Sequence, residues 1–131
     1  MPSFLQPLAQ DRTATAALVN RRTGTIVADQ LIPALDSATR RRGLLHHDSL
    51  PDGSAMIIAP SSAVHTFFMK FAIDVAFVGR DGRIRKIREA VAPWRIAGSL
   101  GSYAVVELPA GALRRAGTRV GDQLAVELAG R

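Results

Sequence analysis

At 131 residues the chain has the length of one domain, and 47% hydrophobic with 21% charged residues excludes a chain that is disordered throughout. The absence of cysteine excludes disulfides and thiolate metal sites. The net charge of +6, carried mostly by arginine, fits nucleic acid, anionic lipid or acidic metabolites as partners, and equally a compositional bias without a function.

The sequence predicts no targeting or membrane-spanning segment. Residues 1–10 have neither a basic start nor an apolar run long enough for a signal peptide. The longest uncharged stretch, residues 53–69, is interrupted by Pro60. We therefore expect a cytoplasmic protein with no membrane partner, in which residues 1–14 form an N-terminal lead-in and residues 15–131 form a single globular domain.

The first elements in chain order are two predicted strands over residues 15–20 and 25–31. The intervening turn contains Gly24, which can adopt the positive φ that a hairpin requires. Pro33 is expected to end the second strand because proline cannot donate to a sheet ladder.

A short helix is predicted next. Asp36 is a favourable N-cap, the helix is expected to run through Arg42, and Gly43 supplies the residue after it. The three arginines at 40–42 lie near the negative end of the helix dipole, where cations are stabilising. Thr39 stands in place of the glutamate that would complete a capping box.

The strand predicted over residues 73–78 is apolar on both sides, which is typical of a strand inside a sheet. Alternation directs Asp74 to the side opposite Ile73 and Val75, among small apolar neighbours. An ionised carboxylate in such surroundings requires compensation. Asp74 therefore predicts an arginine, a lysine or several backbone amides directed at it.

The other elements follow at short spacing. The run after Asp81-Gly82 fits both helical spacing and a bulged strand, and the preceding turn with β-branched residues favours the strand. The remaining predictions are strands over residues 55–59, 83–91, 103–108 and 123–128, a helix over residues 110–116 and an irregular segment over residues 93–102. Together they predict an α+β fold, mostly antiparallel β, with a barrel-like or sandwich-like sheet and two short helices.

Several short motifs occur in a characteristic order. They are Arg40, Gly-Leu-Leu at 43–45, Ala-Met-Ile at 55–57, Phe-Phe-Met-Lys at 67–70, Ala-Ile-Asp at 72–74, Asp-Gly at 81–82, Glu-Leu-Pro-Ala-Gly at 107–111 and Gly-Asp at 121–122. This ordered set spans roughly residues 15 to 128 and resembles the family catalogued as domain of unknown function 192. The resemblance implies a compact, mostly antiparallel β fold with small helices, and it supplies no activity.

The chain departs from that family's pattern at several positions. Leu45 replaces methionine, His46 replaces the usual arginine, Phe68 replaces tryptophan, Phe71 replaces a polar residue and Ala72 replaces proline. These departures predict a more apolar floor in any pocket that the family shares, and therefore a different choice of ligand.

The candidate site combines Arg40, Asp74 and Glu107. Glu107 lies in an apolar run, so its carboxylate is expected to be buried or partly buried. One interpretation is an ion network that fixes strand register, with Arg40 as a bidentate partner of one acid. The other interpretation sets both carboxylates at the mouth of an apolar pocket. The complete predicted ligand-binding set is Arg40, Met56, Phe67, Met69, Lys70, Asp74, Trp94 and Glu107.

Three functional classes follow from these residues. The favoured class is a non-catalytic domain that binds a small ligand or a protein partner at the pocket. The alternative is a hydrolytic enzyme with Asp74 and Glu107 as the acid–base pair. The third is a basic nucleic-acid-associated protein that uses residues 83–88, although charges on an edge strand more often prevent sheet association, and exposed aromatics for base stacking are missing there.

No metal site or cofactor is predicted. The histidines at 46, 47 and 65 could in principle join Asp74 around zinc, but they lack the spacing of known zinc motifs. The sequence makes no prediction about oligomeric state.

Overall fold

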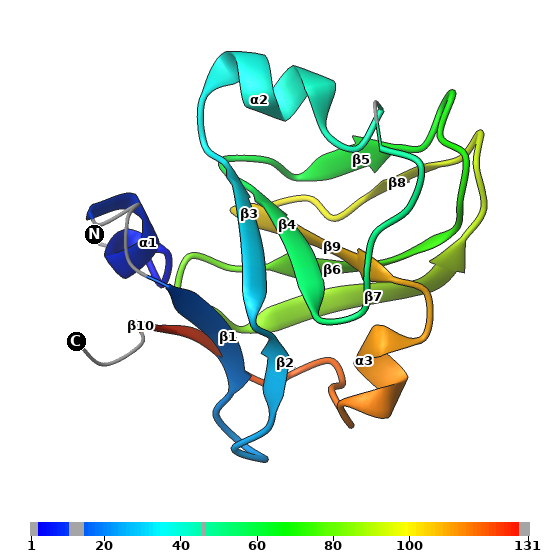
Figure 1. Cartoon of the computed structure of the whole chain (residues 1–131). Coiled ribbons are helices and arrows are strands. Elements are labelled where there is room, and N and C mark those ends of the chain that lie inside the picture. Colours follow the sequence, from blue (N-terminus) through cyan, green and yellow to red (C-terminus); the bar gives the residue numbers. More distant parts are fainter. Residues whose placement is uncertain (1–2, 11–14, 46, 129–131) are drawn as a thin grey trace.

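The protein is described by a computed structural model that covers residues 3–10, 15–45 and 47–128. Its elements are α1 (Gln6–Gln10), β1 (Ala16–Asn20), β2 (Ile26–Ala28), β3 (Gln30–Ala34), α2 (Ser37–Arg42), β4 (Ser54–Ile58), β5 (Ala63–His65), β6 (Ile73–Val78), β7 (Ile84–Val91), β8 (Ile96–Gly98), β9 (Ala104–Pro109), α3 (Ala112–Arg115) and β10 (Leu124–Leu128). Figure 1 shows short helices around strands that do not close into a barrel. The predicted α+β class with mostly antiparallel strands is confirmed, with three short helices in the described residues instead of two.

The main sheet has five strands in the order β3-β4-β9-β6-β7. All its pairs are antiparallel except β3 with β4, which run parallel. Every residue of β6 and of β9 is buried. Both strands lie inside the sheet and are covered on both faces, which explains why neither shows a polar side in the sequence.

This sheet separates two clusters of buried apolar side chains. Alternation along β6 sends Val75 and Phe77 into one cluster and Ala76 and Val78 into the other. The first cluster, with Met56, Ile58 and Val105, lies on the face that α2 and the β5–β8 ribbon cover (Figure 1). A residue's position along a strand therefore decides which of two separate interiors its side chain enters.

The strand predictions need correction at several points. The run expected over residues 25–31 is divided at Asp29 into β2 and β3, and β3 continues through Pro33. Proline is tolerated because β3 is an edge strand of the sheet, where one row of amides has no partner strand. The segment expected to be irregular contains β8, which pairs with β5 in a ribbon that the sequence did not predict.

The cap of α2 and the N-terminal segment also differ from the predictions. The cap of α2 is a complete capping box, because the Asp36 carboxylate accepts from Thr39 N at 2.8 Å while Asp36 N donates to Thr39 Oγ1 at 3.4 Å. Leu5 and Leu8, which the sequence analysis assigns to a lead-in, lie in the core cluster opposite α2. Strand β7 is irregularly paired with β6, as expected for a bulged strand.

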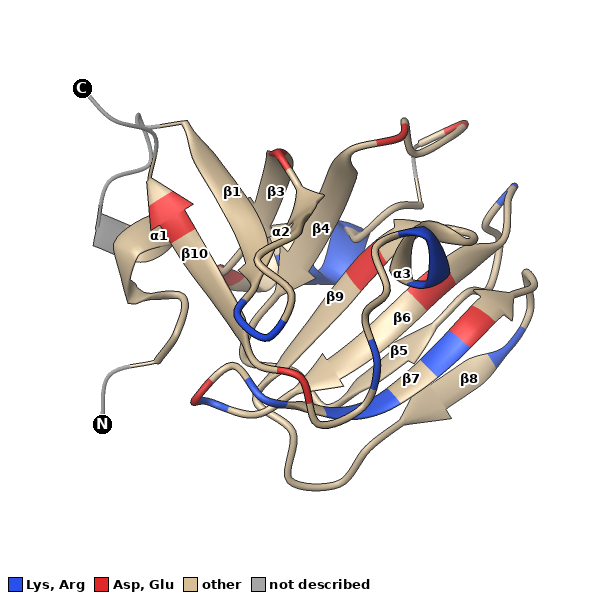
Figure 2. Ribbon diagram, turned by 90° about the horizontal axis from the view of Figure 1, so that it is seen from below, with Lys and Arg blue, Asp and Glu red and all other residues tan. Residues whose placement is uncertain are grey.

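The basic run of residues 83–88 lies mostly on β7, at the edge of the main sheet. Figure 2 shows basic residues on this edge strand, whereas the acids of β6 and β9 lie within the sheet. Charged side chains on an edge strand oppose pairing with another sheet.

In the part of the chain that the structure describes, no helix has the length and apolarity needed to cross a bilayer.

A second sheet, β10-β1-β2, is held to the turn before β10 by a polar network. Asn20 is fully buried and donates from Nδ2 to Asp122 Oδ2 at 2.8 Å. The same carboxylate accepts from Arg22 Nε at 2.6 Å and from Arg119 N at 3.0 Å. The Arg22 hydrogen bonds hold the pKa of Asp122 well below its usual range.

Replacing Asp122 with alanine is expected to lower the free energy of unfolding at neutral pH by about 2 kcal/mol, because the buried Asn20 amide loses one of its two acceptors and keeps only Thr118 Oγ1. A carboxylate with a depressed pKa contributes its full stabilisation above the unfolded-state value of about 3.9 and loses it as the pH falls below that value. Urea unfolding at about pH 7 and about pH 3 should therefore show a smaller difference between wild type and Asp122→Ala in acid. An equal difference at both pH values would contradict the assigned ionisation.

Candidate functional site

The site is centred on Glu107, which points from β9 into the interior on the α2 side of the main sheet. Glu107 is opposite Met56 of β4 and Val75 of β6, and directly opposed residues project to the same face. Only 2% of Glu107 is exposed. Its carboxyl group is therefore surrounded by apolar side chains, in agreement with the expected burial.

The Glu107 carboxyl group lacks compensation for this burial. Its Oε1 atom has no hydrogen-bond partner among the described residues, and none of the ion pairs found there includes Glu107. Burial raises the pKa of Glu107 to about 7, because desolvation penalises the charged form. A buried polar atom without a partner is rare in a folded protein, and a ligand that donates a hydrogen bond would relieve it.

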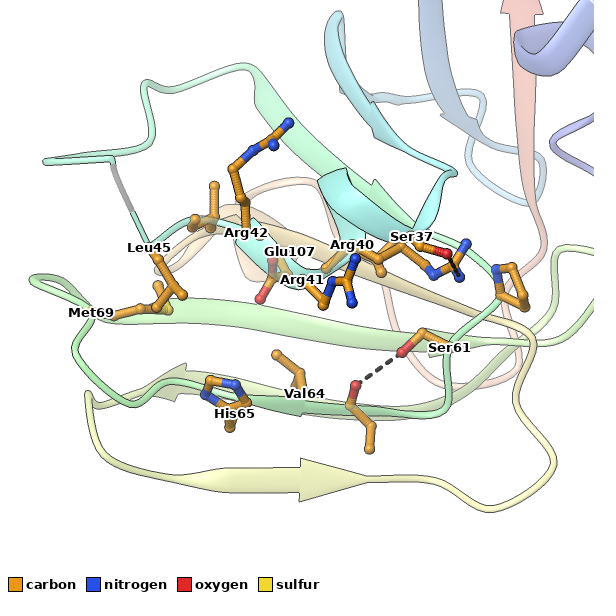
Figure 3. Close-up of a pocket in the computed structure, with 15 residues that line it drawn as sticks. Ser37, Arg40, Arg41, Arg42, Leu45, Ser61, Val64, His65, Met69 and Glu107 are labelled. Carbon is orange, nitrogen blue, oxygen red and sulfur yellow. Dashed lines mark hydrogen bonds between the residues drawn. The ribbon is translucent and has the colours of Figure 1, made fainter.

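Glu107 lies against a cavity of about 390 Å³ between α2, β5 and the sheet. The side chains that line the cavity are those of Ser37, Arg40, Arg41, Arg42, Leu44, Leu45, Ile58, Pro60, Ser61, Ala63, Val64, His65, Met69 and Glu107, with the backbone of Gly43. Figure 3 shows Glu107 beneath α2, with Leu45 and Met69 to one side and Arg41 and Ser61 to the other. The volume is within the range of small-molecule sites.

The cavity combines a carboxyl group with arginines from α2. Ser37 and Arg41 are four residues apart, so they share one face of the helix, with Arg40 adjacent. Arg40 donates to Leu35 O at 3.1 Å and lies 3.4 Å from Ser37 Oγ. All three arginines line the cavity, but the Arg42 side chain is directed upward in Figure 3, whereas that of Arg41 lies below the helix. Within the described residues no hydrogen bond or ion pair is formed by the Arg41 side chain.

Asp74 is buried on the opposite face of the same sheet. Asp74 is opposite Leu108 in the β6–β9 register, one position away from the Val75–Glu107 pair. Its Oδ1 accepts from Ala90 N at 2.9 Å, and its Oδ2 accepts from Gly111 N and Leu113 N, each at 3.1 Å. The predicted compensation of Asp74 by backbone amides is therefore correct.

The predicted Arg40–Asp74–Glu107 network is not formed. Arg40 donates to Ser37 in its own helix and to Leu35, which precedes the helix. Neither acid has an arginine partner in the described part of the chain. A sheet lies between the two carboxyl groups because their positions on β6 and β9 differ in parity. One substrate bond cannot contact acids on opposite faces of a sheet, so the geometry offers no acid–base pair.

The eight predicted ligand-binding residues are distributed over several environments. Arg40, Met69 and Glu107 line the cavity. Met56 is buried beside Glu107 in the same core cluster, and Lys70 is exposed with its Nζ 2.7 Å from Asp48 Oδ1. Asp74 belongs to the other face.

The two predicted aromatic residues lie outside the cavity. Phe67 and Trp94 stack with their ring centroids 5.8 Å apart, and Phe68 contacts Trp94 at 4.6 Å. His65, which lines the cavity, connects it to this surface cluster, because its ring lies 5.0 Å from that of Phe67.

Sequence reasoning missed most of the cavity wall. Arg41 is predicted only as a charge at a helix end, and Ser61 and Val64 fall between predicted elements. The spacing of Ser37 and Arg41 identifies a shared helix face, but nothing local indicates that this face covers β9.

In the described residues, which leave out His46, no three histidine or acidic side chains group as metal ligands.

Comparison with known proteins agrees with this fold. The chain superimposes on the crystal structure of a putative transcription regulator from Sinorhizobium meliloti 1021 with a TM-score of 0.73 and 25% identity, over 90% of this chain and 95% of that one. A protein of unknown function from Novosphingobium aromaticivorans DSM 12444 gives a TM-score of 0.72 and 25% identity, over 86% and 83%. No curated protein matches the chain.

The family comparison covers most of the chain. The matching model is described as "DUF192: Uncharacterized ACR, COG1430", and the match extends over residues 18–126. This range contains every motif on which the resemblance was based, from Arg40 to Gly121-Asp122. The chain belongs to the domain of unknown function 192 family.

Proposed function

We propose that this protein binds a small polar molecule in the cavity between α2, β5 and the main sheet, with the Glu107 carboxyl group as the recognition element. The single observation that carries this proposal is the buried Glu107 Oε1 without a hydrogen-bond partner, beside a cavity of about 390 Å³. A ligand that donates a hydrogen bond to this carboxyl group supplies a partner that the described residues do not provide.

The walls support a ligand with a carbon skeleton. Leu44, Ile58 and Met69 are buried side chains that line the cavity, and Leu45 and Val64 are partly buried beside them. Apolar walls with a few convergent polar groups are the usual composition of a small-molecule site. The polar residues here are Glu107, the α2 arginines, Ser37, Ser61 and His65.

Binding without catalysis accounts for these observations better than hydrolysis. Hydrolysis by paired carboxyl groups needs both acids on one substrate, and Asp74 and Glu107 face opposite sides of the sheet. Nucleic-acid binding has one point in its favour, since one structural neighbour is described as a putative transcription regulator. The basic run of residues 83–88, which the sequence suggested for nucleic-acid contact, lies mostly on the edge strand β7, where charged side chains also oppose sheet association.

The test is an NMR titration of the full chain with a set of small amines, polyols, hydroxy acids and phosphate esters. At least one compound is expected to shift the resonances of cavity residues such as Val64 and Met69. Its affinity should fall at least about tenfold in Glu107→Leu, which removes the acceptor and occupies its space, a loss of about 1.4 kcal/mol or more.

Two further variants make the result specific. Val64→Phe keeps Glu107 but fills the cavity, and it should also abolish binding. Glu127→Gln removes an exposed carboxylate of β10 and should leave the affinity unchanged. Failure of every compound to shift cavity resonances, or equal affinity in wild type and Val64→Phe, would refute the proposal.

A further inference from the structure

We infer that the ligand of the Glu107 cavity is a small zwitterion, with an amine held by Glu107 and an acidic group held by Arg40 and Arg41. This inference rests on the proposed function and specifies its ligand class. It follows from the positions of the carboxyl group and the arginines around the cavity, from the apolar side chains that line it and from the volume available.

The two charge types in the cavity do not neutralise each other. Burial raises the pKa of Glu107 through desolvation, and none of the ion pairs among the described residues joins Glu107 to an arginine. Arg40 is bonded to Leu35 O and Ser37 Oγ, and Arg41 has neither a hydrogen bond nor an ion pair within the described part of the chain. The cavity therefore has a carboxyl group and arginines that form no ion pair with each other among the described residues.

The arginines retain donors for an anion. A guanidinium group has five N–H donors in a planar fork that matches carboxylate and phosphate oxygens. Arg40 uses Nη1 and Nη2 to donate to Leu35 O and Ser37 Oγ. The guanidinium group of Arg41 makes no hydrogen bond within the described residues and can donate to a ligand. Both residues line the cavity, and the Arg41 side chain lies below the helix (Figure 3).

A ligand that satisfies both ends needs a hydrogen-bond donor for Glu107 and an acidic group for the arginines, and an amine is the donor that also compensates an ionised carboxylate. A ligand with an amine alone would meet Glu107 but would lie beside two uncompensated arginine charges. A ligand with an acidic group alone would meet the arginines but would leave Glu107 Oε1 without a donor. The side chain of Val64 lies below the gap between Glu107 and Arg41 and suits methylene groups between the two charges (Figure 3).

The test uses probes that separate the two charges. Straight-chain ω-amino acids of increasing length are compared with the n-alkylamine and the n-alkyl carboxylate of matching length, by calorimetry and NMR on the full chain. One ω-amino acid is expected to bind at least about tenfold more tightly than both single-charge probes. O-Phosphoethanolamine, compared with ethanolamine and ethyl phosphate, distinguishes a phosphate from a carboxylate as the acidic group.

Charge-removing variants should act on one end of the ligand at a time. Glu107→Gln is expected to weaken the ω-amino acid and the alkylamine at least about tenfold while leaving the alkyl carboxylate unchanged. Arg41→Gln is expected to weaken the ω-amino acid and the alkyl carboxylate and to leave the alkylamine unchanged. Arg88→Gln is the control for loss of an arginine charge, because Arg88 is exposed on β7 and does not line the cavity.

Proton release gives an independent readout. An ammonium group next to Glu107 favours its ionised form, so binding at about pH 7 should release about half a proton, since a carboxyl group with a pKa of about 7 is half protonated there. Calorimetry in two buffers with different ionisation enthalpies measures this release. Glu107→Gln should abolish it.

The outcomes separate this inference from the proposed function. If the alkylamine binds in the cavity as tightly as the ω-amino acid, or if Arg41→Gln affects no probe, the zwitterion class is wrong although cavity binding stands. If no zwitterion shifts a cavity resonance while another compound of the broader set does, the same conclusion follows. If no compound of either set binds there, both fail.

Discussion

Replacing Asp74 with asparagine is expected to lower the free energy of unfolding by about 3 kcal/mol, and replacing it with alanine by about 4–5 kcal/mol. The carboxylate accepts from the backbone N–H groups of Ala90, Gly111 and Leu113, in a site with no exposure to solvent. Asparagine keeps one acceptor oxygen and turns an amide N–H₂ towards at least one of these donors. Alanine leaves all three N–H groups without a partner.

The effect is large because Asp74 joins three separate segments. Ala90 is near the end of β7, Gly111 follows β9, and Leu113 is in α3 and fully buried. Gly111 adopts a φ of 89°, which directs its N–H towards Asp74 at the start of the helix. Loss of the carboxylate should therefore destabilise the β9–α3 connection together with the edge strand.

Urea unfolding followed by circular dichroism measures the change for Asp74→Asn and Asp74→Ala. The matched control is Asp52→Asn, which removes an aspartate whose side chain is 90% exposed and whose Arg115 partner lies 3.5 Å away. This control should remain within about 0.5 kcal/mol of wild type. An Asp74→Asn variant within about 1 kcal/mol of wild type would show that the three amides do not depend on the charge.

The second large effect is a dependence of stability on pH that Glu107 imposes near neutrality. The folded state holds a proton on Glu107 up to a pKa of about 7, whereas an unfolded glutamate releases it near pH 4.5. Between these values the folded state binds more protons, so stability falls as the pH rises through this interval. The total loss is about 3 kcal/mol, at about 1.4 kcal/mol per unit of pKa difference.

Glu107→Gln should remove this loss. The glutamine variant is expected to have a flat profile between about pH 5 and pH 8 and to be more stable than wild type at the upper end, because it has no charge to desolvate. Urea unfolding at unit intervals of pH across this range measures both profiles. Asp122 does not interfere, because its pKa is depressed and its contribution changes only in acid.

Glu127→Gln serves as the control for the change in net charge, since Glu127 is an exposed residue of β10. Its profile should parallel that of wild type. Parallel profiles for wild type and Glu107→Gln would instead mean that Glu107 is solvated in the folded protein, and the basis of the proposed ligand site would then be removed.

Local sequence signals predicted most elements of this fold. Asp36 and Gly43 bound α2, Gly24 and Asp81-Gly82 occupy hairpin turns, and the doubly apolar runs of β6 and β9 are interior strands. These signals act over a few residues, through φ preferences, caps and side-chain alternation. The ribbon of β5 and β8 was not predicted, because strands of three residues that pair with a segment far away in the chain leave no local pattern.

The sequence by itself determined that Asp74 and Glu107 would be buried, since each interrupts an apolar strand. Only the tertiary structure decided that they occupy different interiors, because the register of β6 against β9 sets Asp74 opposite Leu108 and Glu107 opposite Val75. A register shift of one residue would put both carboxyl groups on the same face of the sheet. Register depends on contacts between segments far apart in the chain. Because of this register, Asp74 accepts hydrogen bonds from three backbone amides, while Glu107 lies against a cavity beneath α2.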